Sequence, residues 1–356
     1  MFLEKEGKLI YSYDGETVCI EAWGKDALRV RATKNRSFTG RDWALEAKDA
    51  HAGEVEIFED PSAKGGAFAN MYEGTDTSYG KITNGKLHAV IDSGSVITFY
   101  HEDGRVLLKE HFRRLRDEES MPLNIMGREY SNGVGDNFRI VARFVARKGE
   151  KIFGMGQYQQ HELDLKGCML ELAQRNSQVS VPFYLSSIGY GFLWNNPGVG
   201  QVMFANNGTE WVTESGKEID YLVIAGDTPA EIEENYMTLT GKPPMMPEYG
   251  MGFWQCKLRY WNQEQLLSVA RKYKELGVPL DVIVVDFFHW TKQGEFKFDP
   301  KYWPDVPGMC RELKEMGIQV VVSVWPTVDI YSENFEEMKE KGYLVRTEHG
   351  VPLTML

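Results

Sequence analysis

The sequence is poor in cysteine and has no long apolar run. Only four of its 356 residues are cysteine, and no two of them form a CxxC pair. Such sparse cysteines are usually buried free thiols of a protein in a reducing compartment. No apolar run reaches the length of about 18 residues that a membrane helix needs, and the first residues lack the basic and apolar segments of a signal peptide. We therefore expect a cytoplasmic protein without a membrane span.

Positive charge is also scarce. The chain carries 40 lysine and arginine residues against 52 aspartate and glutamate residues, which gives a net charge of −12. Nucleic-acid binding needs a basic surface that neutralises phosphates, and anionic membranes attract basic clusters. We therefore expect neither nucleic acid nor a membrane as a partner.

The sequence lacks the common motifs of nucleophilic, nucleotide and metal chemistry. It has no GxSxG elbow, no P-loop and no GxGxxG after a strand-like run. His289 and Asp286 are close enough in sequence to share a metal ion, but no third ligand has suitable spacing. We therefore expect no metal and no cofactor.

Up to residue 241 the sequence consists mainly of short β-runs separated by turn signals such as Asn84-Gly85. This alternation predicts an antiparallel β-sandwich. Segments 61–80 and 113–137 are rich in glycine and charge and have weak periodicity, so we expect long loops there. The predicted strands are Thr17–Trp23, Ala27–Thr33, Leu87–Ile91, Val96–Tyr100, Phe138–Val145, Val179–Ser186, Gly191–Asn195, Val202–Ala205 and Glu218–Ala225.

A helix and a proline-rich linker close this first domain. Thr228 and Glu231 form a capping box with Pro229 at the first helical position, and the helix should end at Gly241. The prolines of the run KPPMMP at 242–247 cannot continue a helix. We therefore predict a sandwich domain over 1–241, a linker over 242–248 and a second domain over 249–356.

From residue 249 strands and helices alternate. We expect strands over 249–254, 279–285 and 318–324, and helices after the N-caps Asn262, Asp305 and Ser332. Successive βα units predict a parallel sheet, as in a (β/α)8 barrel or a doubly wound sheet. A closed barrel needs eight strands, and three fit before Leu356. We favour a TIM barrel of which the chain contains the first three βα units.

Candidate functional side chains follow these strands, because sites of parallel βα folds lie at the carboxyl ends of the strands. Asp286 comes directly after the apolar run Val282–Val285 and could accept hydrogen bonds from two sugar hydroxyls, with Phe287, Trp290 and Trp325 against the C–H faces of the ring. Alternatively, Asp286 caps the following loop and the aromatic rings fill the barrel rim.

Two histidines and one further aspartate have both a functional and a structural interpretation. His161 and His289 could contact a ligand or satisfy backbone groups, as lone histidines more often do. Asp299 precedes a proline, which is typical of a turn.

Several short motifs occur in a particular order along the chain. They are Phe153-Gly154-Met155-Gly156-Gln157, Val181–Ser186, Gly189–Asn196, Pro243–Phe253, Val284–Asp286, Phe298-Asp299-Pro300 and Trp303-Pro304-Asp305. In this order and spacing they resemble glycoside hydrolase family 31, which contains α-glucosidases and α-xylosidases. The resemblance is close over residues 150–356 and looser over the first 150.

The resemblance implies a galactose-mutarotase-like β-sandwich followed by a (β/α)8 barrel, retaining chemistry, and no metal or cofactor. It also implies an aspartate nucleophile at the end of the fourth barrel strand and a later aspartate as acid/base. Both would lie beyond Leu356, so we expect no catalytic residue in this chain.

The resemblance further implies substrate-binding positions on the strands that are present. Asp286 matches the family's hydroxyl-binding aspartate, and Phe287 matches the hydrophobic residue beside it. Ser323 and Trp325 match positions around the nonreducing sugar at the end of the third strand. The loop Gln157–His161, which includes both Gln157 and His161, matches a loop of the N-terminal domain that reaches over the barrel mouth.

The resemblance thus implies a retaining, exo-acting α-xylosidase or α-glucosidase that releases a nonreducing-end sugar from oligosaccharides, and we expect this chain to be inactive alone. The motifs at 297–301 and 323–326 favour the α-xylosidase type, and the full-length protein could form homo-oligomers. One alternative is a non-catalytic carbohydrate-binding protein. Another is a sugar epimerase on the sandwich, which would need a histidine and a carboxylate on its concave face; His88, His101 and His111 cannot be placed there from sequence.

Overall fold

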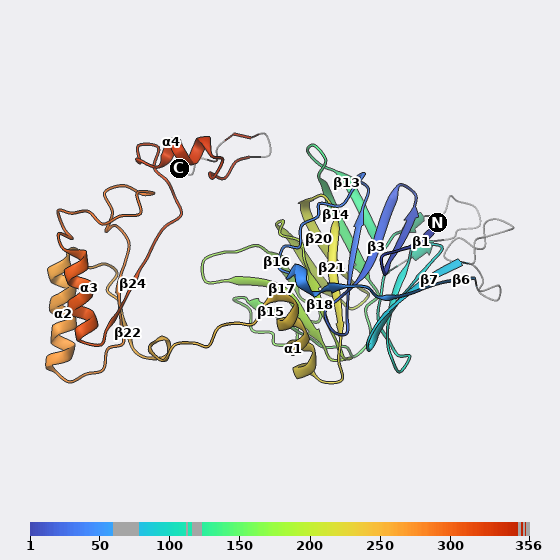
Figure 1. Ribbon diagram of the computed structural model, residues 1–356, viewed down its shortest axis with the longest axis horizontal. Helices are drawn as coiled ribbons and strands as arrows, with labels where there is room; N and C mark the ends of the chain where they lie inside the picture. The colour runs from blue at the N-terminus through green and yellow to red at the C-terminus, as the bar shows by residue number, and fades with distance from the viewer. Residues whose placement is uncertain (60–77, 112, 116–122, 348–349, 352, 354–356) are drawn as a thin grey trace. The chain divides into compact units, whose positions relative to one another are not determined.

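The structure is a computed structural model that describes residues 1–59, 78–111, 113–115, 123–347, 350–351 and 353 (Figure 1). The chain divides into two compact units, Met1–Pro243 and Pro244–Leu356. This division falls inside the predicted linker 242–248. Within the described residues, no helix combines the length and the apolar character that crossing a membrane requires.

The first unit is built on a nine-stranded sheet in which every strand pairs antiparallel with its neighbours. Its strands, in spatial order, are β1 (Phe2–Lys5), β2 (Lys8–Tyr13), β3 (Glu16–Trp23), β4 (Ala27–Thr33), β21 (Ile219–Ala225), β18 (Tyr190–Trp194), β17 (Val179–Ser186) and β15 (Ile152–Gln157), with β5 (Ala50–His51) paired to β3. A 3-10 turn, η1 (Ala47–Asp49), precedes β5.

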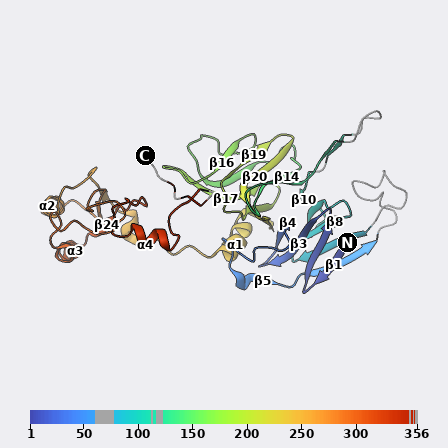
Figure 2. The ribbon, with the colours of Figure 1, turned by 90° about the horizontal axis from the view of Figure 1, so that it is seen from above.

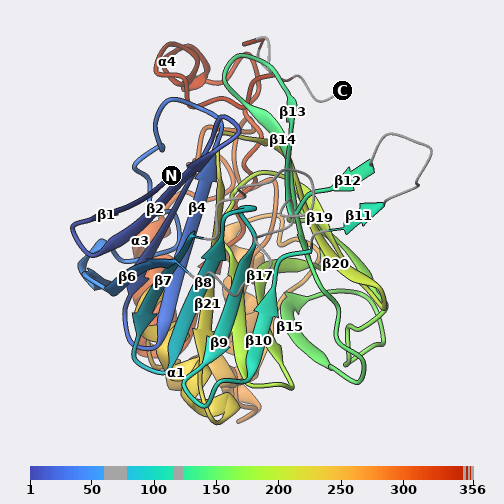
Figure 3. The ribbon, with the colours of Figure 1, turned by 90° about the vertical axis from the view of Figure 1, so that its right-hand side faces the viewer.

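The described residues of this unit also form two five-stranded antiparallel sheets and one hairpin (Figures 2 and 3). One sheet has the order β10 (Val106–Lys109), β9 (Ile97–His101), β8 (Leu87–Asp92), β7 (Ser78–Asn84), β6 (Glu54–Glu59). The other has the order β13 (Arg128–Asn132), β14 (Phe138–Phe144), β20 (Gly208–Gly216), β19 (Gly200–Ala205), β16 (Met169–Leu172). The hairpin pairs β11 (Arg113–Leu115) with β12 (Leu123–Ile125).

The main core lies between the nine-stranded sheet and the two five-stranded sheets, as expected of a sandwich. Phe144 of β14 meets Phe192 of β18 and Tyr221 of β21 edge to face, with ring centroids 5.3 and 5.4 Å apart. Phe99 of β9 reaches Tyr221 at 6.2 Å, so all three sheets meet around that ring. These contacts confirm the predicted antiparallel sandwich.

Every residue of β21 is buried, because both faces of this strand are covered. Tyr221 and Val223 face the main core, while Leu222 and Ile224 pack with helix α1 (Pro229–Thr240) on the opposite face of the sheet. The helix begins as predicted: the Thr228 hydroxyl accepts a hydrogen bond from the backbone N–H of Glu231.

The predicted long loops are partly wrong. Residues 78–80 belong to β7, and the segment 113–137 contains β11, β12 and β13, whereas residues 61–77 lie outside the described part of the chain. Strand β13 has no apolar alternation in its sequence, because its one buried side chain is the charged Arg128 and the other four positions are partly or fully exposed.

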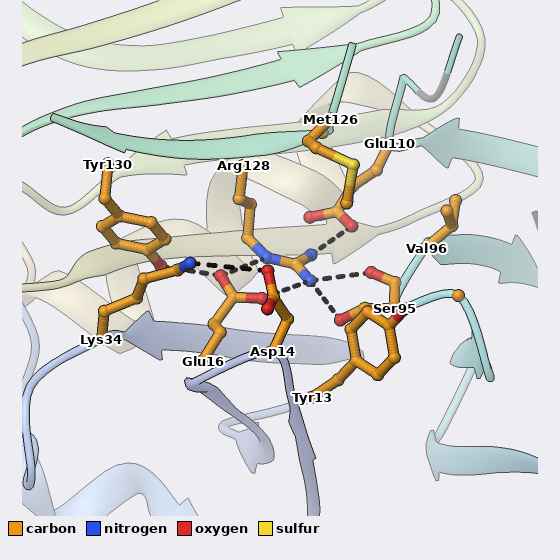
Figure 4. A pocket seen from close by; sticks show the side chains of 12 residues that line it. Tyr13, Asp14, Glu16, Lys34, Ser95, Val96, Glu110, Met126, Arg128 and Tyr130 are labelled. Atoms are coloured by element: carbon orange, nitrogen blue, oxygen red, sulfur yellow. Dashed lines mark hydrogen bonds and ion pairs between the residues drawn. The ribbon is translucent and has the colours of Figure 1, made fainter. Parts of the chain in front are cut away.

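Arg128 occupies a core position because its guanidinium is surrounded by acceptors (Figure 4). It donates to both carboxylate oxygens of Glu16 at 2.9 and 3.0 Å, to Glu110, and to the backbone and side-chain oxygens of Ser95 at 2.7 Å. A buried charge is tolerated when it is paired and hydrogen-bonded in this way. No apolar alternation in the sequence marks such a strand.

The described residues of the second unit form a three-stranded parallel sheet and three helices. The strands are β22 (Trp254–Gln255), β23 (Val282–Val285) and β24 (Gln319–Val322), and the helices are α2 (Gln263–Glu275), α3 (Val306–Glu315) and α4 (Phe335–Glu340). Leu266 and Ala270 of α2 and Met309 and Leu313 of α3 share one core with Ile283 of β23. The predicted caps of α2 and α3 are confirmed, since the side chains of Asn262 and Asp305 accept from Gln265 and Gly308.

Two elements of the second unit differ from the prediction. The segment predicted as a strand from 249 to 254 forms the 3-10 turn η2 (Glu248–Met251), and β22 itself contains two residues. The carboxylate of Asp281 accepts a hydrogen bond from the backbone N–H of Phe253 at 3.0 Å. This N–H therefore cannot donate to a neighbouring strand. Helix α4 begins at Phe335, and Ser332 instead accepts the N–H of Asn334 at 3.3 Å in the turn before it.

Candidate active site

The carboxyl ends of the three parallel strands form the candidate site of the second unit. Cys256, Asp286 and Ser323 each follow one of these strands. The Cys256 thiol lies 3.5 Å from Oδ2 of Asp286, and the backbone N–H of Ser323 donates to Val285 at 2.9 Å. The structure therefore brings the predicted Asp286 and Ser323 to one edge of the sheet.

Asp286 is partly buried and anchors its own loop. Its Oδ1 accepts the backbone N–H of Phe287 at 2.8 Å, and its Oδ2 faces the thiol of Cys256. The loop-capping interpretation is therefore correct for one oxygen. A carboxylate has about four lone-pair sites, so two donors still leave acceptor capacity for sugar hydroxyls. The two interpretations of Asp286 are compatible.

Aromatic rings from the loops after β23 and β24 form a cluster. Phe287 stacks on Trp325 with a centroid distance of 5.6 Å and an interplanar angle of 21°, and Trp290 lies 6.0 Å from Trp325. Trp325 is 39% exposed, so a large part of its surface is open to solvent. An exposed aromatic surface next to a carboxylate suits a sugar ring, which has apolar C–H faces and polar edges.

Phe288, which no sequence pattern indicated, contributes to the same aromatic cluster. Its ring lies 5.6 Å from that of Trp325 and 5.9 Å from that of Trp290. Its backbone φ is +59°, a conformation that is rare for bulky residues and often found at functional sites. The Arg259 guanidinium lies 5.4 Å from the Phe288 ring and 3.7 Å from that of Trp261. Neither the positive φ nor the arginine contact has a signal in the sequence.

His289 has a structural role. It is buried, its Nδ1 lies 3.1 Å from the backbone oxygen of Asp286, and its own backbone oxygen accepts the N–H of Asp299 at 2.7 Å. Burial lowers the pKa of His289, while the Asp286 carbonyl opposes this shift. Asp299 is the predicted turn residue: its Oδ1 accepts the N–H of Lys301 at 2.9 Å.

Gln157 and His161 belong to the first unit, and both are exposed. Gln157 ends β15, whose pairing with β17 shifts register between Gly154 and Gly156. A Cβ on Gly156 would lie 2.3 Å from the backbone oxygen of Val179, and its φ is +90°. The glycines of this motif therefore allow a bulge and a close approach of two strands. That Gln157 and His161 contact substrate stays a prediction.

The prediction that the four cysteines are buried free thiols is correct in part. All four cysteines are free, but Cys256 and Cys310 are exposed, while Cys19 is buried and Cys168 partly so. Burial raises the pKa of Cys19 to about 11, so this thiol is inert. An exposed thiol is normal on the outside of a helix such as α3, but Cys256 lies at the strand ends beside Asp286.

The described residues show no group of three or more histidine, cysteine, aspartate or glutamate side chains arranged to hold a metal ion. The first unit has a small cavity of about 70 Å³ beside Arg128, which is room for a few water molecules (Figure 4). Two of the three histidines named for an epimerase have other partners: His88 stacks on Tyr100 at 5.1 Å, and His101 contacts Asp103 and Asp227 at 3.1 and 3.2 Å.

Comparison with known proteins connects both units to one family. Residues 17–202 match the glycosyl hydrolase 31 N-terminal galactose mutarotase-like domain, and residues 243–355 match the glycosyl hydrolases family 31 TIM-barrel domain. These matches confirm the predicted classes of both domains and favour the barrel over the doubly wound sheet.

Among curated relatives, an uncharacterized family 31 glucosidase of Pseudescherichia vulneris is 42% identical over 364 residues, which is 99% of this chain and 65% of that protein. An α-xylosidase of Saccharolobus solfataricus is 36% identical over 219 residues, 58% of this chain and 30% of that protein. The crystal structure of a GH31 α-xylosidase from a soil metagenome, complexed with xylose, is 46% identical with a TM-score of 0.86, covering 100% of this chain and 51% of that one. The chain thus spans two thirds or less of these relatives, and it belongs to glycoside hydrolase family 31.

Proposed function

We propose that this chain is the N-terminal portion of a retaining α-glycoside hydrolase that removes a nonreducing-end xylose or glucose from oligosaccharides. The observation that carries the proposal is that Asp286, directly after β23, shares its loop with Phe288, whose exposed ring lies 5.6 Å from that of Trp325 after β24. The names of the relatives, α-xylosidases and glucosidases, support the same class of substrate.

In this proposal Asp286 binds substrate and does not react. Retaining cleavage needs two carboxyl groups about 5–5.5 Å apart, one as nucleophile and one as acid/base. We propose that both come from residues beyond Leu356, so that the chain 1–356 alone is inactive. Asp286 would accept hydrogen bonds from two hydroxyls of the nonreducing sugar. Hydrogen bonds that become stronger as the sugar ring flattens toward the transition state lower the activation barrier of the reaction as well as the Michaelis constant.

The aromatic cluster supports xylose over glucose as the sugar released. Glucose differs from xylose by one hydroxymethyl group. We propose that Phe287, Phe288 and Trp325, which lie within 5.6 Å of one another by ring centroids, form a wall that leaves no room for this group. Discrimination by an apolar pocket at this scale is about 1–3 kcal/mol, a factor of roughly 10–200.

The test is hydrolysis of nitrophenyl α-xyloside and α-glucoside by a protein that continues past Leu356, compared with Asp286→Asn. Losing the charge weakens two hydroxyl contacts, and hydrogen bonds to charged groups contribute about 1.5–3 kcal/mol each. We expect kcat/KM to fall roughly a hundredfold or more. An Asp286→Asn variant as active as the wild type would contradict the proposal.

A second candidate function is carbohydrate binding without catalysis. It is favoured by the fact that Asp286 and the rings are already assembled within residues 244–356. The discriminating observation is activity: a longer protein that binds xylose but cleaves neither glycoside would favour this second function.

A further inference from the structure

The thiol of Cys256 contacts the same carboxylate that the proposed function assigns to sugar binding. Its Sγ lies 3.5 Å from Oδ2 of Asp286 and 3.4 Å from the backbone oxygen of Lys257. A thiol has one proton to donate. Because an ionised acceptor attracts a proton donor more strongly than a neutral carbonyl does, the carboxylate is the favoured partner.

The backbone before Cys256 is held in place by its neighbours. The side-chain Oε1 of Gln255 accepts from the hydroxyl of Tyr273 at 2.9 Å, and its Nε2 lies 3.4 Å from the hydroxyl of Tyr260. Gln255 also pairs with Ile283 in the parallel ladder of β22 and β23. These contacts fix the end of a strand only two residues long, and with it the position of the thiol.

We propose that Cys256 is a positioning residue for Asp286, whose thiol holds Oδ2 while the N–H of Phe287 holds Oδ1. Each carboxylate oxygen then has one protein donor, and the plane of the carboxylate is fixed before a sugar arrives. The remaining lone pairs are directed by this plane toward substrate hydroxyls. The inference rests on the proposed function, in which Asp286 binds the sugar.

The electrostatics of the pair agree with this arrangement. Burial and the Asp286 carboxylate raise the pKa of the Cys256 thiol, so it stays a protonated donor at neutral pH. Other titratable or charged groups near the pair include His289, whose Nδ1 faces the Asp286 backbone oxygen, and Tyr260, which interacts electrostatically with the thiol. Lys257 follows Cys256 in the chain, and the Arg259 guanidinium lies 5.9 Å from the ring of Phe287.

The first test measures the contact without any sugar. The rates at which iodoacetamide alkylates Cys256 and Cys310 are followed by peptide mass spectrometry from neutral to alkaline pH, in the wild-type chain and in Asp286→Asn. Removing the negative charge should move the Cys256 profile to lower pH and leave the profile of Cys310, on α3, unchanged. A shift of both thiols, or of neither, would overturn the proposal.

The second test measures sugar binding by titrating the chain with xylose and following tryptophan fluorescence. We expect Cys256→Ala to weaken binding about three- to tenfold, Cys256→Ser to recover most of this loss because a hydroxyl also donates, and Cys310→Ala to bind as the wild type does. Binding by the wild type should also weaken at alkaline pH, where the thiolate can no longer donate, and Cys256→Ser should lack this weakening. Equal affinities for Cys256→Ala and wild type would refute the role.

The two hypotheses fail in different ways. If Asp286→Asn binds xylose as tightly as the wild type, the proposed function fails, whatever Cys256 does. If Asp286→Asn loses binding and Cys256→Ala does not, only the positioning role fails. Both hypotheses can still be tested if Cys256→Ala folds poorly. The alkylation test uses the wild-type chain and Asp286→Asn and needs no bound sugar. The binding test can rely on Cys256→Ser, whose side chain is similar in size to that of cysteine.

Discussion

At the scale of single residues, Asp286 combines a loop contact with the sugar-binding role that we propose for it. One carboxylate oxygen ties down the N–H of Phe287, and the other faces Cys256. A carboxylate used in this way is already desolvated on one side and fixed in orientation, which reduces the entropy lost when it binds a hydroxyl. The loop contact thus prepares the group for the role that we propose.

The residues of the site differ in how far the sequence could reveal them. Asp286 was identifiable because it follows a buried apolar strand, and Trp325 because it follows the next one. Phe288 and Cys256 were missed because their roles depend on a positive φ and on a contact between two strands that are 30 residues apart. Neither a backbone dihedral nor a cross-strand distance is encoded in a local pattern.

Replacing Trp325 tests the aromatic side of the site. Trp325→Ala removes the ring that stacks on Phe287, and we expect the affinity for xylose to fall about tenfold, which is roughly 1.4 kcal/mol. Because the side chain is 39% exposed and packs against Phe287, we also expect some loss of stability. The measurement is a xylose titration followed by NMR, together with a thermal melt.

The matched control for Trp325 is Phe253→Ala. Phe253 is 47% exposed and lies at the opposite, amino edge of the sheet, where its backbone oxygen accepts the N–H of Val282. This variant should keep the affinity of the wild type for xylose. If both variants weakened binding equally, the aromatic cluster at the strand ends would not be the sugar-binding surface.

At the scale of elements, the helix starts whose signals lie in neighbouring residues were predicted correctly. The caps Thr228, Asn262 and Asp305 all accept the hydrogen bond that their helices require. Elements whose residues contradict the usual pattern were not predicted. Strand β13 has a charged residue in its core position, and β22 is shortened because Asp281 takes a backbone N–H. In each case a distant partner, invisible to local periodicity, determines the conformation.

The bulge in β15 offers a test of one such element. Gly156→Ala would place a Cβ 2.3 Å from the oxygen of Val179 at a φ of +90°. We expect a loss of stability of about 2–4 kcal/mol, from backbone strain and from the displacement of β17. Denaturant unfolding monitored by circular dichroism measures this change.

Gly167→Ala separates the two causes, because Gly167 has a φ of +91° and nothing within 4 Å of the added Cβ. It should cost about 1 kcal/mol, the contribution of the backbone conformation alone. Equal losses in the two variants would show that the close approach of β15 to β17 contributes nothing.

At the scale of the whole molecule, the two units differ in how completely their sheets are covered. The first unit encloses its core between three sheets, and α1 covers a further face. Among the described residues of the second unit, β22 and β24 are the two edge strands of a sheet of three. Exposed strand edges and large apolar side chains such as Val324 and Tyr343 favour association with further chain.

This difference predicts unequal stability within the chain 1–356. Hydrogen exchange should be much slower in β21, which is buried on both faces, than in β23, and a hydrophobic dye should bind the second unit. In a longer protein whose added strands pair with β22 and β24, protection of β23 should rise and dye binding should fall, because the edges are then covered. Equal protection of β21 and β23 in the chain 1–356 would mean that three parallel strands with two packed helices already form a complete folding unit. The prediction that the edges of β22 and β24 are unstable without further pairing would then be wrong.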